Sequence, residues 1–310
     1  MLYNAHPPRD LPVALPPYPK PTSVPTSVPP QPVNTVETVI EPVRGWGLPD
    51  FRAVFQSSEL WWALAWRDLR VRYRQTVLGL AWTVLTPFIS MVVFSVIFGS
   101  LLQVPTDGHP YPVMLFSGLL VWRLFENVLH AACQSLIVNQ NLIGKLYFPR
   151  LLLPLTPILT FLVNYCVGLI ILAGLMVWFQ MMPTWRLLTL PLWVGLAILA
   201  ALSIGLWCAA LNAIMRDIQH AIPFITGLML FVTPVMYTQK SITARFPQAL
   251  LAVYELNPMV AIIDGARWAV LPGWAPPNGM AVVSLSIMFV VLVGGLVFFT
   301  RAEQNVVDVV

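Results

Sequence analysis

The chain has 310 residues, of which 58% are hydrophobic and 10% are charged, whereas soluble globular domains are about 45–50% apolar and about 25% charged. This composition excludes an ordinary soluble domain, because too few polar side chains are present to cover its surface. The formal net charge is +4, but the basic residues are spread thinly between apolar runs, which indicates membrane topology signals rather than a nucleic-acid partner.

The first part of the chain is rich in proline. Residues 1–43 hold 12 of the 29 prolines, interleaved with Ser, Thr and Val, a composition that favours extended polyproline conformation and cannot bury a core. We expect residues 1–50 to be a largely disordered cytoplasmic tail and residues 51–310 to form one transmembrane domain. A docking role for the tail is the alternative to a simple extension.

Residues 51–66 precede the first long apolar run and differ from it. Three tryptophans, Trp61, Trp62 and Trp66, stand here beside polar positions such as Glu59. This pattern is typical of an amphipathic helix that lies in the headgroup region. We expect that helix on the cytoplasmic surface of the membrane.

A basic stripe follows this segment. Arg67, Arg70 and Arg74 recur at i, i+3 and i+7, so in a helix they share one face. Such a stripe binds anionic headgroups or a phosphate-bearing substrate, and plain positive-inside anchoring is the alternative reading. Tyr73 beside it is either an interfacial anchor or a ring for sugar stacking.

Six apolar segments are long enough to cross a bilayer, which takes about 20 apolar residues. The expected spans are residues 78–102, 112–135, 151–179, 187–213, 219–238 and 279–300. If the N-terminus lies inside, eight flanking Lys and Arg residues fall on the cytoplasmic side and four on the outside. The positive-inside rule therefore predicts that both termini are cytoplasmic.

The second expected span carries ionisable residues. Arg123, Glu126 and His130 recur on one helical face, with Trp122 and Phe125 adjacent. Because a charge inside the membrane is costly, such a face is expected to line a cavity or to meet a partner. The alternative is an Arg123–Glu126 pair that neutralises itself between helices.

Two further segments do not fit as spans. Residues 139–150, NQNLIGKLYFPR, are polar at their ends and apolar between, which predicts a short amphipathic helix stopped by Pro149. Between the fifth and sixth spans, residues 242–272 contain two apolar pieces divided by Asn257–Pro258. Pieces of this length predict a re-entrant hairpin on the outer side, and an ordinary outer loop is the alternative.

The residue patterns of common catalytic sites are missing. Gly144–Lys145 is followed by Leu rather than Ser or Thr, so no phosphate-binding loop is present. The four histidines have no paired spacing for a metal, and Cys133, Cys166 and Cys208 lie in apolar stretches. We expect no catalytic residue, metal or cofactor on this chain, and no ATP hydrolysis by it alone.

Four motifs together resemble a known family. RDLRVRYRQTVLGLAWTVLTP at 67–87, NLIGKLYFPRLLLP at 141–154, Arg216–Asp217–Ile218, and ELNPMVAIIDGAR at 255–267 are similar to the membrane subunit of ABC exporters for bacterial cell-surface polysaccharides. That family includes the O-antigen, capsule and teichoic-acid exporters. The resemblance covers the chain from about residue 51 to its C-terminus and leaves out the Pro-rich tail.

The resemblance implies a homodimeric channel in the bacterial inner membrane with two copies of a separate soluble ATPase, which binds ATP and magnesium. The substrate it implies is a polysaccharide on a polyprenyl-diphosphate or other lipid carrier. The basic stripe would meet the diphosphate. Apart from the resemblance, sugar faces stack on aromatic rings, so we expect the glycan to pass Trp122, Phe125, Trp207 and Tyr254; packing or an interface belt is the alternative role for each. The implied contacts with the ATPase are Asn141, Lys145, Tyr147 and Arg150, and the implied outer gate is Tyr254, Asn257, Pro258 and Arg267.

Two other classes of function stay open. An ion-coupled carrier or channel would explain the spans and the Arg123–Glu126–His130 face without an ATPase. A membrane-embedded transferase acting on a lipid-linked sugar would need a carboxylate near the interface, and Glu255 or Asp264 would supply it.

Overall fold

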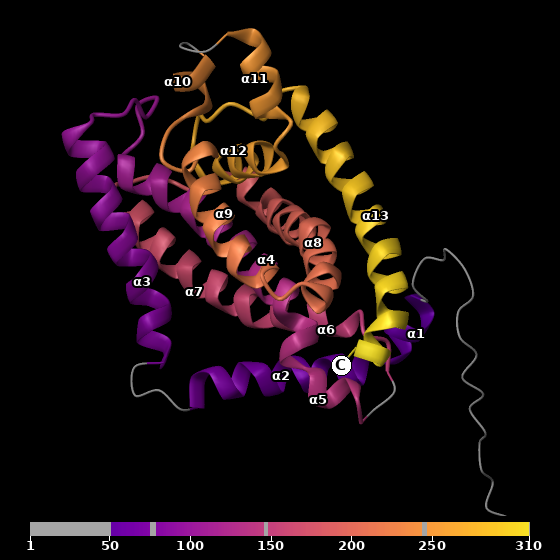
Figure 1. The fold of residues 1–310 in the computed structure, drawn as a ribbon. Helices are drawn as coiled ribbons and strands as arrows, with labels where there is room; N and C mark the ends of the chain where they lie inside the picture. The colour runs from indigo at the N-terminus through magenta and orange to yellow at the C-terminus, as the bar shows by residue number, and fades with distance from the viewer. Residues whose placement is uncertain (1–50, 75–78, 146–147, 244–246, 310) are drawn as a thin grey trace, which may run out of the picture. The chain divides into compact units, whose positions relative to one another are not determined.

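The computed structural model describes residues 51–309 except 75–78, 146–147 and 244–246. All of these residues belong to the second of two units in the chain, Arg44–Val310. The tail expected at residues 1–50 and the Tyr147 side chain lie outside the described residues. Every regular element in the described part is helical (Figure 1), which confirms the prediction of an all-α membrane protein.

The segment before the first span forms two helices, α1 (Phe51–Gln56) and α2 (Ser58–Arg74). The helix continues past residue 66, where we expected it to end, because no proline or glycine interrupts the sequence up to Arg74. Arg67 and Arg70 therefore lie on α2 and not on the first spanning helix. Figure 1 shows α2 lying across one end of the bundle, which we call the α2 end.

Among the described residues, five helical segments are long and apolar enough to span a membrane: Val84–Leu101, Tyr111–Val138, Leu152–Trp178, Trp185–Ile214 and Met280–Ala302. Their elements are α3 (Gly79–Phe94) with the π-helix η1 (Ser95–Leu101), α4 (Tyr111–Val138), α6 (Leu152–Leu155) with α7 (Pro157–Trp178), η2 (Trp185–Thr189) with α8 (Leu190–Ile214), and α13 (Met280–Val309). The span expected at 219–238 is α9 (Ile218–Val232), which has 15 residues. At 1.5 Å per residue it is about 22 Å long, shorter than a hydrocarbon core of about 30 Å. The count of six spans is not confirmed.

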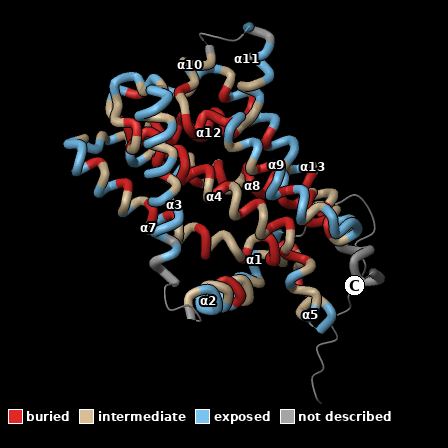
Figure 2. The backbone as a smooth tube through the Cα atoms, turned by 60° about the vertical axis from the view of Figure 1, so that its left-hand side comes forward, coloured by how far each residue is buried: buried red, intermediate tan, exposed pale blue. Residues whose placement is uncertain are grey.

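Helix α4 is the centre of the bundle. It packs against α7, α8, α9 and α12, and Figure 2 shows that most of its length is buried. Asn212 of α8, which is fully buried, donates to Cys133 O of α4 at 3.1 Å and accepts from Gln219 N of α9 at 3.2 Å. Helix α3 is different, because its apolar side chains are largely exposed and so face lipid or another protein.

The opposite end of the bundle, the α12 end, holds α10 (Gln239–Thr243), α11 (Gln248–Glu255) and α12 (Pro258–Val270). The break predicted at Asn257–Pro258 is confirmed, since Asn257 caps α12 by accepting from Met259 N at 3.0 Å. Helix α12 is buried against α4, α8 and α13. Its burial in protein does not confirm a re-entrant hairpin in the membrane.

Close packing of α12 on α8 depends on Gly265. A Cβ at this position would lie 2.4 Å from ring atoms of Trp193, so we expect Gly265→Ala to destabilise the chain by about 1–3 kcal/mol. Gly195→Ala is the matched control, because a Cβ there would meet nothing within 4 Å. Alanine is more favourable than glycine in a helix by up to about 1 kcal/mol, so we expect this variant to be no less stable than the parent chain. Thermal unfolding in mild detergent measures both, and equal melting temperatures would contradict this account of the packing.

Candidate functional site

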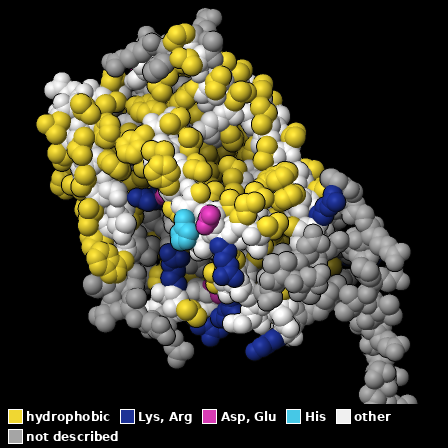
Figure 3. Space-filling model, in the orientation of Figure 1, with side chains coloured by type: hydrophobic (Ala, Val, Ile, Leu, Met, Phe, Trp, Pro, Cys, Tyr) yellow, Lys and Arg dark blue, Asp and Glu magenta, His cyan; other side chains and the backbone are white. Residues whose placement is uncertain are grey.

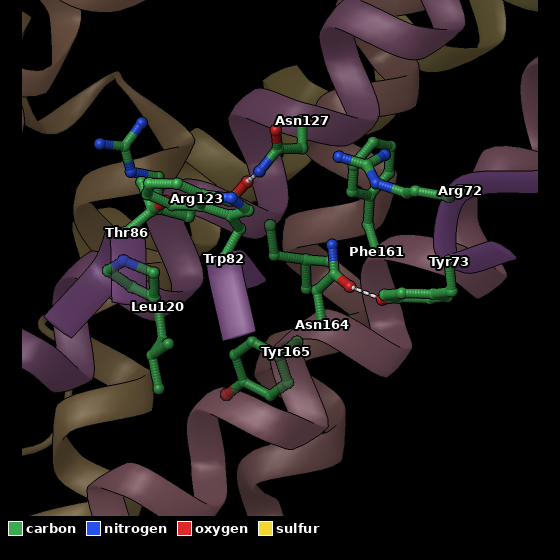
Figure 4. A pocket seen from close by; sticks show the side chains of 12 residues that line it. Arg72, Tyr73, Trp82, Thr86, Leu120, Arg123, Asn127, Phe161, Asn164 and Tyr165 are labelled. Atoms are coloured by element: carbon green, nitrogen blue, oxygen red, sulfur yellow. Dashed lines mark hydrogen bonds between the residues drawn. The ribbon is translucent and has the colours of Figure 1, made fainter. Parts of the chain in front are cut away.

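A cavity of about 340 Å³ lies between α2, α3, α4 and α7 (Figure 4). Its lining residues are Arg72, Tyr73, Trp82, Thr86, Pro87, Leu120, Arg123, Leu124, Asn127, Phe161, Asn164 and Tyr165. We call it the arginine cavity, because the described residues that line it include two arginines and no carboxylate. It therefore combines positive charge with aromatic surface.

The side chains of the arginine cavity are held by contacts between helices and within α4. Arg72 lies 4.8 Å from the centre of the Phe161 ring, and the Tyr73 hydroxyl donates to Asn164 Oδ1. Asn127 Nδ2 donates to Arg123 O at 2.6 Å. These contacts hold the Arg72 guanidinium and two amides around a space that Arg123 also lines, a donor set suited to phosphate oxygens.

Arg123 forms an ion pair and also lines the arginine cavity. Its Nη1 lies 3.0 Å from Glu126 Oε2, so the i,i+3 ion pair forms, yet its side chain stays 37% exposed and lines the cavity. Glu126 does not line it. His130 instead lies 2.8 Å from Thr226 Oγ1 of α9, so the polar face of α4 is divided between the cavity and the contact with α9.

The described arginines of the basic stripe, Arg67 and Arg70, do not line the arginine cavity. Arg67 contacts Asp68 at 2.9 Å and Asn139 at 3.4 Å, and Arg70 lies 5.8 Å from the Trp66 ring centre. The Arg74 side chain lies outside the described part. Arg72 is not part of the predicted stripe, but it lines the cavity. It lies about 140° around the helix from Arg67 and therefore on another face of α2. In the sequence, Arg72 is marked only by its position next to Tyr73. In the structure, the Tyr73 hydroxyl donates to Asn164 of α7.

Two of the rings expected to stack on sugars are in the core. Trp122 is 1% exposed and Phe125 is 5% exposed, and the two ring centres are 5.2 Å apart. In this conformation neither ring has a face available to a ligand. The aromatic residues that line the cavity are instead Tyr73, Trp82, Phe161 and Tyr165.

In its described residues, 139–145 and 148–150, the segment expected to contact the ATPase has one short helix, α5 (Gln140–Ile143), which ends before Gly144 rather than at Pro149. Leu142 and Ile143 pack on a small core that also receives Leu60 and Trp61 of α2. Asn141 and Lys145 are exposed, and Arg150 is half-buried. The segment and the interfacial helix thus share one core, and the Arg67–Asn139 contact joins them again.

Arg267, expected at the outer gate, is fully buried. It donates to Met114 O at 3.3 Å, Tyr237 O at 3.1 Å and Val235 O at 2.7 Å. Residues 233–238 are not helical, so their carbonyls lack helix partners and need other donors. The Tyr111 hydroxyl also donates a hydrogen bond to this connection, to Met236 O at 2.8 Å. Arg267 thus holds the connection after α9.

The other residues expected at the outer gate lie close to that connection. Asn257 Nδ2 donates to Thr233 Oγ1 at 3.3 Å, and Pro258 is the first residue of α12. Tyr254 and Asn257 line a mainly apolar groove together with Tyr237 and Leu250. These residues surround the end of α9, whereas Arg267 lies beneath the connection in the core.

These features define a multi-pass integral membrane protein with a cationic cavity between its helices. Residues 59–271 match the ABC-2 type transporter family, and the chain belongs to that family. It is 28% identical over 255 residues to the O-antigen export system permease protein RfbA of Myxococcus xanthus, covering 82% of this chain and 96% of the relative. An RfbA of the same description from Klebsiella pneumoniae is 23% identical, covering 78% and 92%. The polysialic acid transport protein KpsM of Escherichia coli is 25% identical, covering 78% and 93%.

Proposed function

We propose that this chain is the membrane subunit of an ATP-driven exporter that moves a lipid-linked polysaccharide out of the cytoplasm across a bacterial inner membrane. The observation that carries the proposal is the arginine cavity. Two guanidinium groups meet there beside aromatic and aliphatic side chains, so one space offers charge for a diphosphate and apolar surface for a polyprenyl chain.

The position of the charges supports a substrate that approaches at the α2 end. In the face that Figure 3 shows, hydrophobic side chains cover most of the surface, and Lys, Arg, Asp, Glu and His side chains gather toward that end. Two arginines on one diphosphate form charge-assisted hydrogen bonds, about twice as strong as neutral ones. Membership of the ABC-2 family favours this function over the ion-coupled carrier and the transferase.

The proposed topology places both termini and α2 in the cytoplasm. Helix α9 contacts α4 and α8, and with the non-helical residues 233–238 it would complete a sixth crossing. The hairpin of α11 and α12 would then lie on the outer side, re-entrant within the protein. Reactivity of single cysteines toward a membrane-impermeant reagent tests this topology.

The proposed assembly contains two copies of this chain and two copies of a soluble ATPase, which would bind ATP and magnesium. The exposed apolar faces of α3 and α9 leave room for a second copy beside lipid. The segment around α5 would receive the movement of the ATPase, because its core is continuous with that of α2. A closing ATPase would in this way shift the helix that borders the arginine cavity.

Deletion of the gene in its native cell tests the function. We expect the polysaccharide to disappear from the cell surface and its lipid-linked form to accumulate inside, and we expect the tagged chain to co-purify with a protein that has a nucleotide-binding loop. Unchanged surface polysaccharide, or a chain that purifies alone after crosslinking, would contradict the proposal.

The double variant Lys145→Ala and Arg150→Ala tests coupling. Because an exposed lysine and a half-buried arginine would be lost from the surface that meets the ATPase, we expect export to fall while ATP hydrolysis by the purified complex no longer responds to substrate. The pair Arg52→Ala and Arg301→Ala is the matched control, since it removes the same charge from other helices at the α2 end. Normal export by the first variant would weigh heavily against coupling through this segment.

A further inference from the structure

A second cavity, of about 270 Å³, lies at the α12 end. Its lining residues are Asp107, His109, Thr238, Gln239, Lys240, Glu255, Asp264, Gly273, Trp274, Ala275, Pro276 and Asn278. They come from three connections, before α4, after α9 and before α13, and from α10, α11 and α12. We call it the outer cavity. None of its residues takes part in the arginine cavity.

Planar polar side chains dominate the lining of the outer cavity. Glu255 Oε1 accepts from Gln239 Nε2 at 2.6 Å and from Asn278 Nδ2 at 2.8 Å. Lys240 Nζ lies 3.3 Å from Asp107 Oδ2. The amides therefore hold the Glu255 carboxylate in one orientation, which gives the cavity a fixed set of donors and acceptors.

Asp264 is the buried polar group of this lining. It is 8% exposed, and within the described part of the chain it accepts one hydrogen bond, from Trp274 Nε1 to Oδ1 at 3.3 Å. A carboxylate has about four acceptor sites, and buried carboxylates normally have more of them filled. Since Asp264 borders the cavity, its remaining acceptor capacity is available to a ligand there.

The chemistry of the lining selects the class of ligand. Among the described residues, no cluster of His, Cys, Asp and Glu has the arrangement to hold a metal ion. Lys240 pairs with Asp107, and the Arg267 guanidinium interacts with the buried Asp264. This leaves the Glu255 carboxylate in excess and disfavours an anion. Burial lowers the pKa of His109. The Asp107 carboxylate acts in the opposite direction, whereas the Lys240 cation lowers this pKa further. A neutral imidazole has one donor and one acceptor nitrogen, as hydroxyl groups require.

We propose that the outer cavity binds one sugar unit of the exported glycan, and that it favours a unit without a carboxylate. The volume is below the roughly 300–1,000 Å³ of sites for drug-sized molecules, so it suits one ring rather than a longer segment. Hydroxyl groups would donate to Asp264 and Glu255 and accept from Asn278. This inference rests on the proposed function, because the glycan must emerge at the α12 end.

Photo-crosslinking in the native cell tests this site on the full chain with its partners in place. A photoreactive amino acid is placed at Ala275, which is exposed and borders the outer cavity, or at Gln103, which is exposed on a neighbouring connection outside it. A third position, Thr86, borders the arginine cavity. After irradiation, the tagged chain is purified and stained for covalently attached glycan.

We expect the Ala275 position to give about tenfold more glycan adduct than Gln103, the effect of about one charge-assisted hydrogen bond. Glu255→Lys should reduce that yield to the Gln103 level. Asn278→Ala, at an exposed position, should also reduce it and provides a second variant if the first does not accumulate. An undiminished yield in an accumulated variant would overturn the proposal.

The remaining outcomes separate the two proposals. Adduct at Thr86 with none at Ala275, or equal yields at Ala275 and Gln103, would overturn the sugar site and leave the exporter function standing. Absence of adduct at all three positions, together with unchanged surface polysaccharide in the deletion strain, would overturn the exporter function itself.

Discussion

Replacement of Arg267 by leucine is expected to lower the free energy of unfolding by about 3–5 kcal/mol. The carbonyls of Val235 and Tyr237 would lose the donor that Arg267 provides, and Met114 O would keep only its other donor, Ser117 Oγ at 2.8 Å. The guanidinium also lies 5.5 Å from the Trp274 ring centre, and that contact would be lost. Because the side chain is fully buried, water cannot replace these bonds without opening the core.

Thermal unfolding in mild detergent, followed by size-exclusion chromatography, measures this effect. Arg186→Leu is the matched control, because Arg186 is partly exposed and donates one long bond, 3.4 Å, to Trp274 O. We expect the control to lose less than about 1 kcal/mol. Arg267→Lys should fall between the two, since an ammonium keeps the charge and some of the hydrogen bonds. If Arg267→Leu matched the control in stability, the connection after α9 would not depend on this arginine.

The second large effect concerns export. The double variant Arg72→Ala and Arg123→Ala is expected to reduce the rate of polysaccharide appearance on the cell surface at least about tenfold, because each charge-assisted bond to a phosphate contributes about 1.5–3 kcal/mol. The variant removes both cations that line the arginine cavity in the described part of the chain. Pulse-labelling of surface polysaccharide, normalised to the amount of the chain in the membrane, measures it.

Arg70→Ala, compared with Arg72→Ala, is the matched control, because it removes the same charge from α2 outside the cavity. It is expected to retain most of the export rate. A larger loss in this control than in the cavity variant would favour the stripe that the sequence predicted over the arginine cavity as the proposed substrate site. Because Arg123 also pairs with Glu126, Arg123→Ala combined with Glu126→Gln separates loss of the cation from exposure of an unpaired carboxylate.

Much of the fold could be predicted from the sequence, because its signals are local. A long charge-free interval requires lipid as solvent, so the positions of the apolar helices follow from composition and length. The break at Asn257–Pro258 follows from the geometry of proline and of the residue before it, and Asn257 is found as the cap of α12. The motifs at 67–87, 141–154 and 255–267 fall within the region that matches the ABC-2 family, residues 59–271.

The environment of each side chain was decided by tertiary structure. The sequence gives the spacing of the arginines on α2, but only the packing of α2 on α7 shows that Arg72 is the one that lines the cavity. The spacing on α4 does not reveal that Trp122 is enclosed in the core. The acceptors of Arg267 lie 30, 32 and 153 positions away in sequence. Hydropathy and spacing describe one helix at a time, whereas burial, ion pairs and cavities depend on which faces of different helices meet.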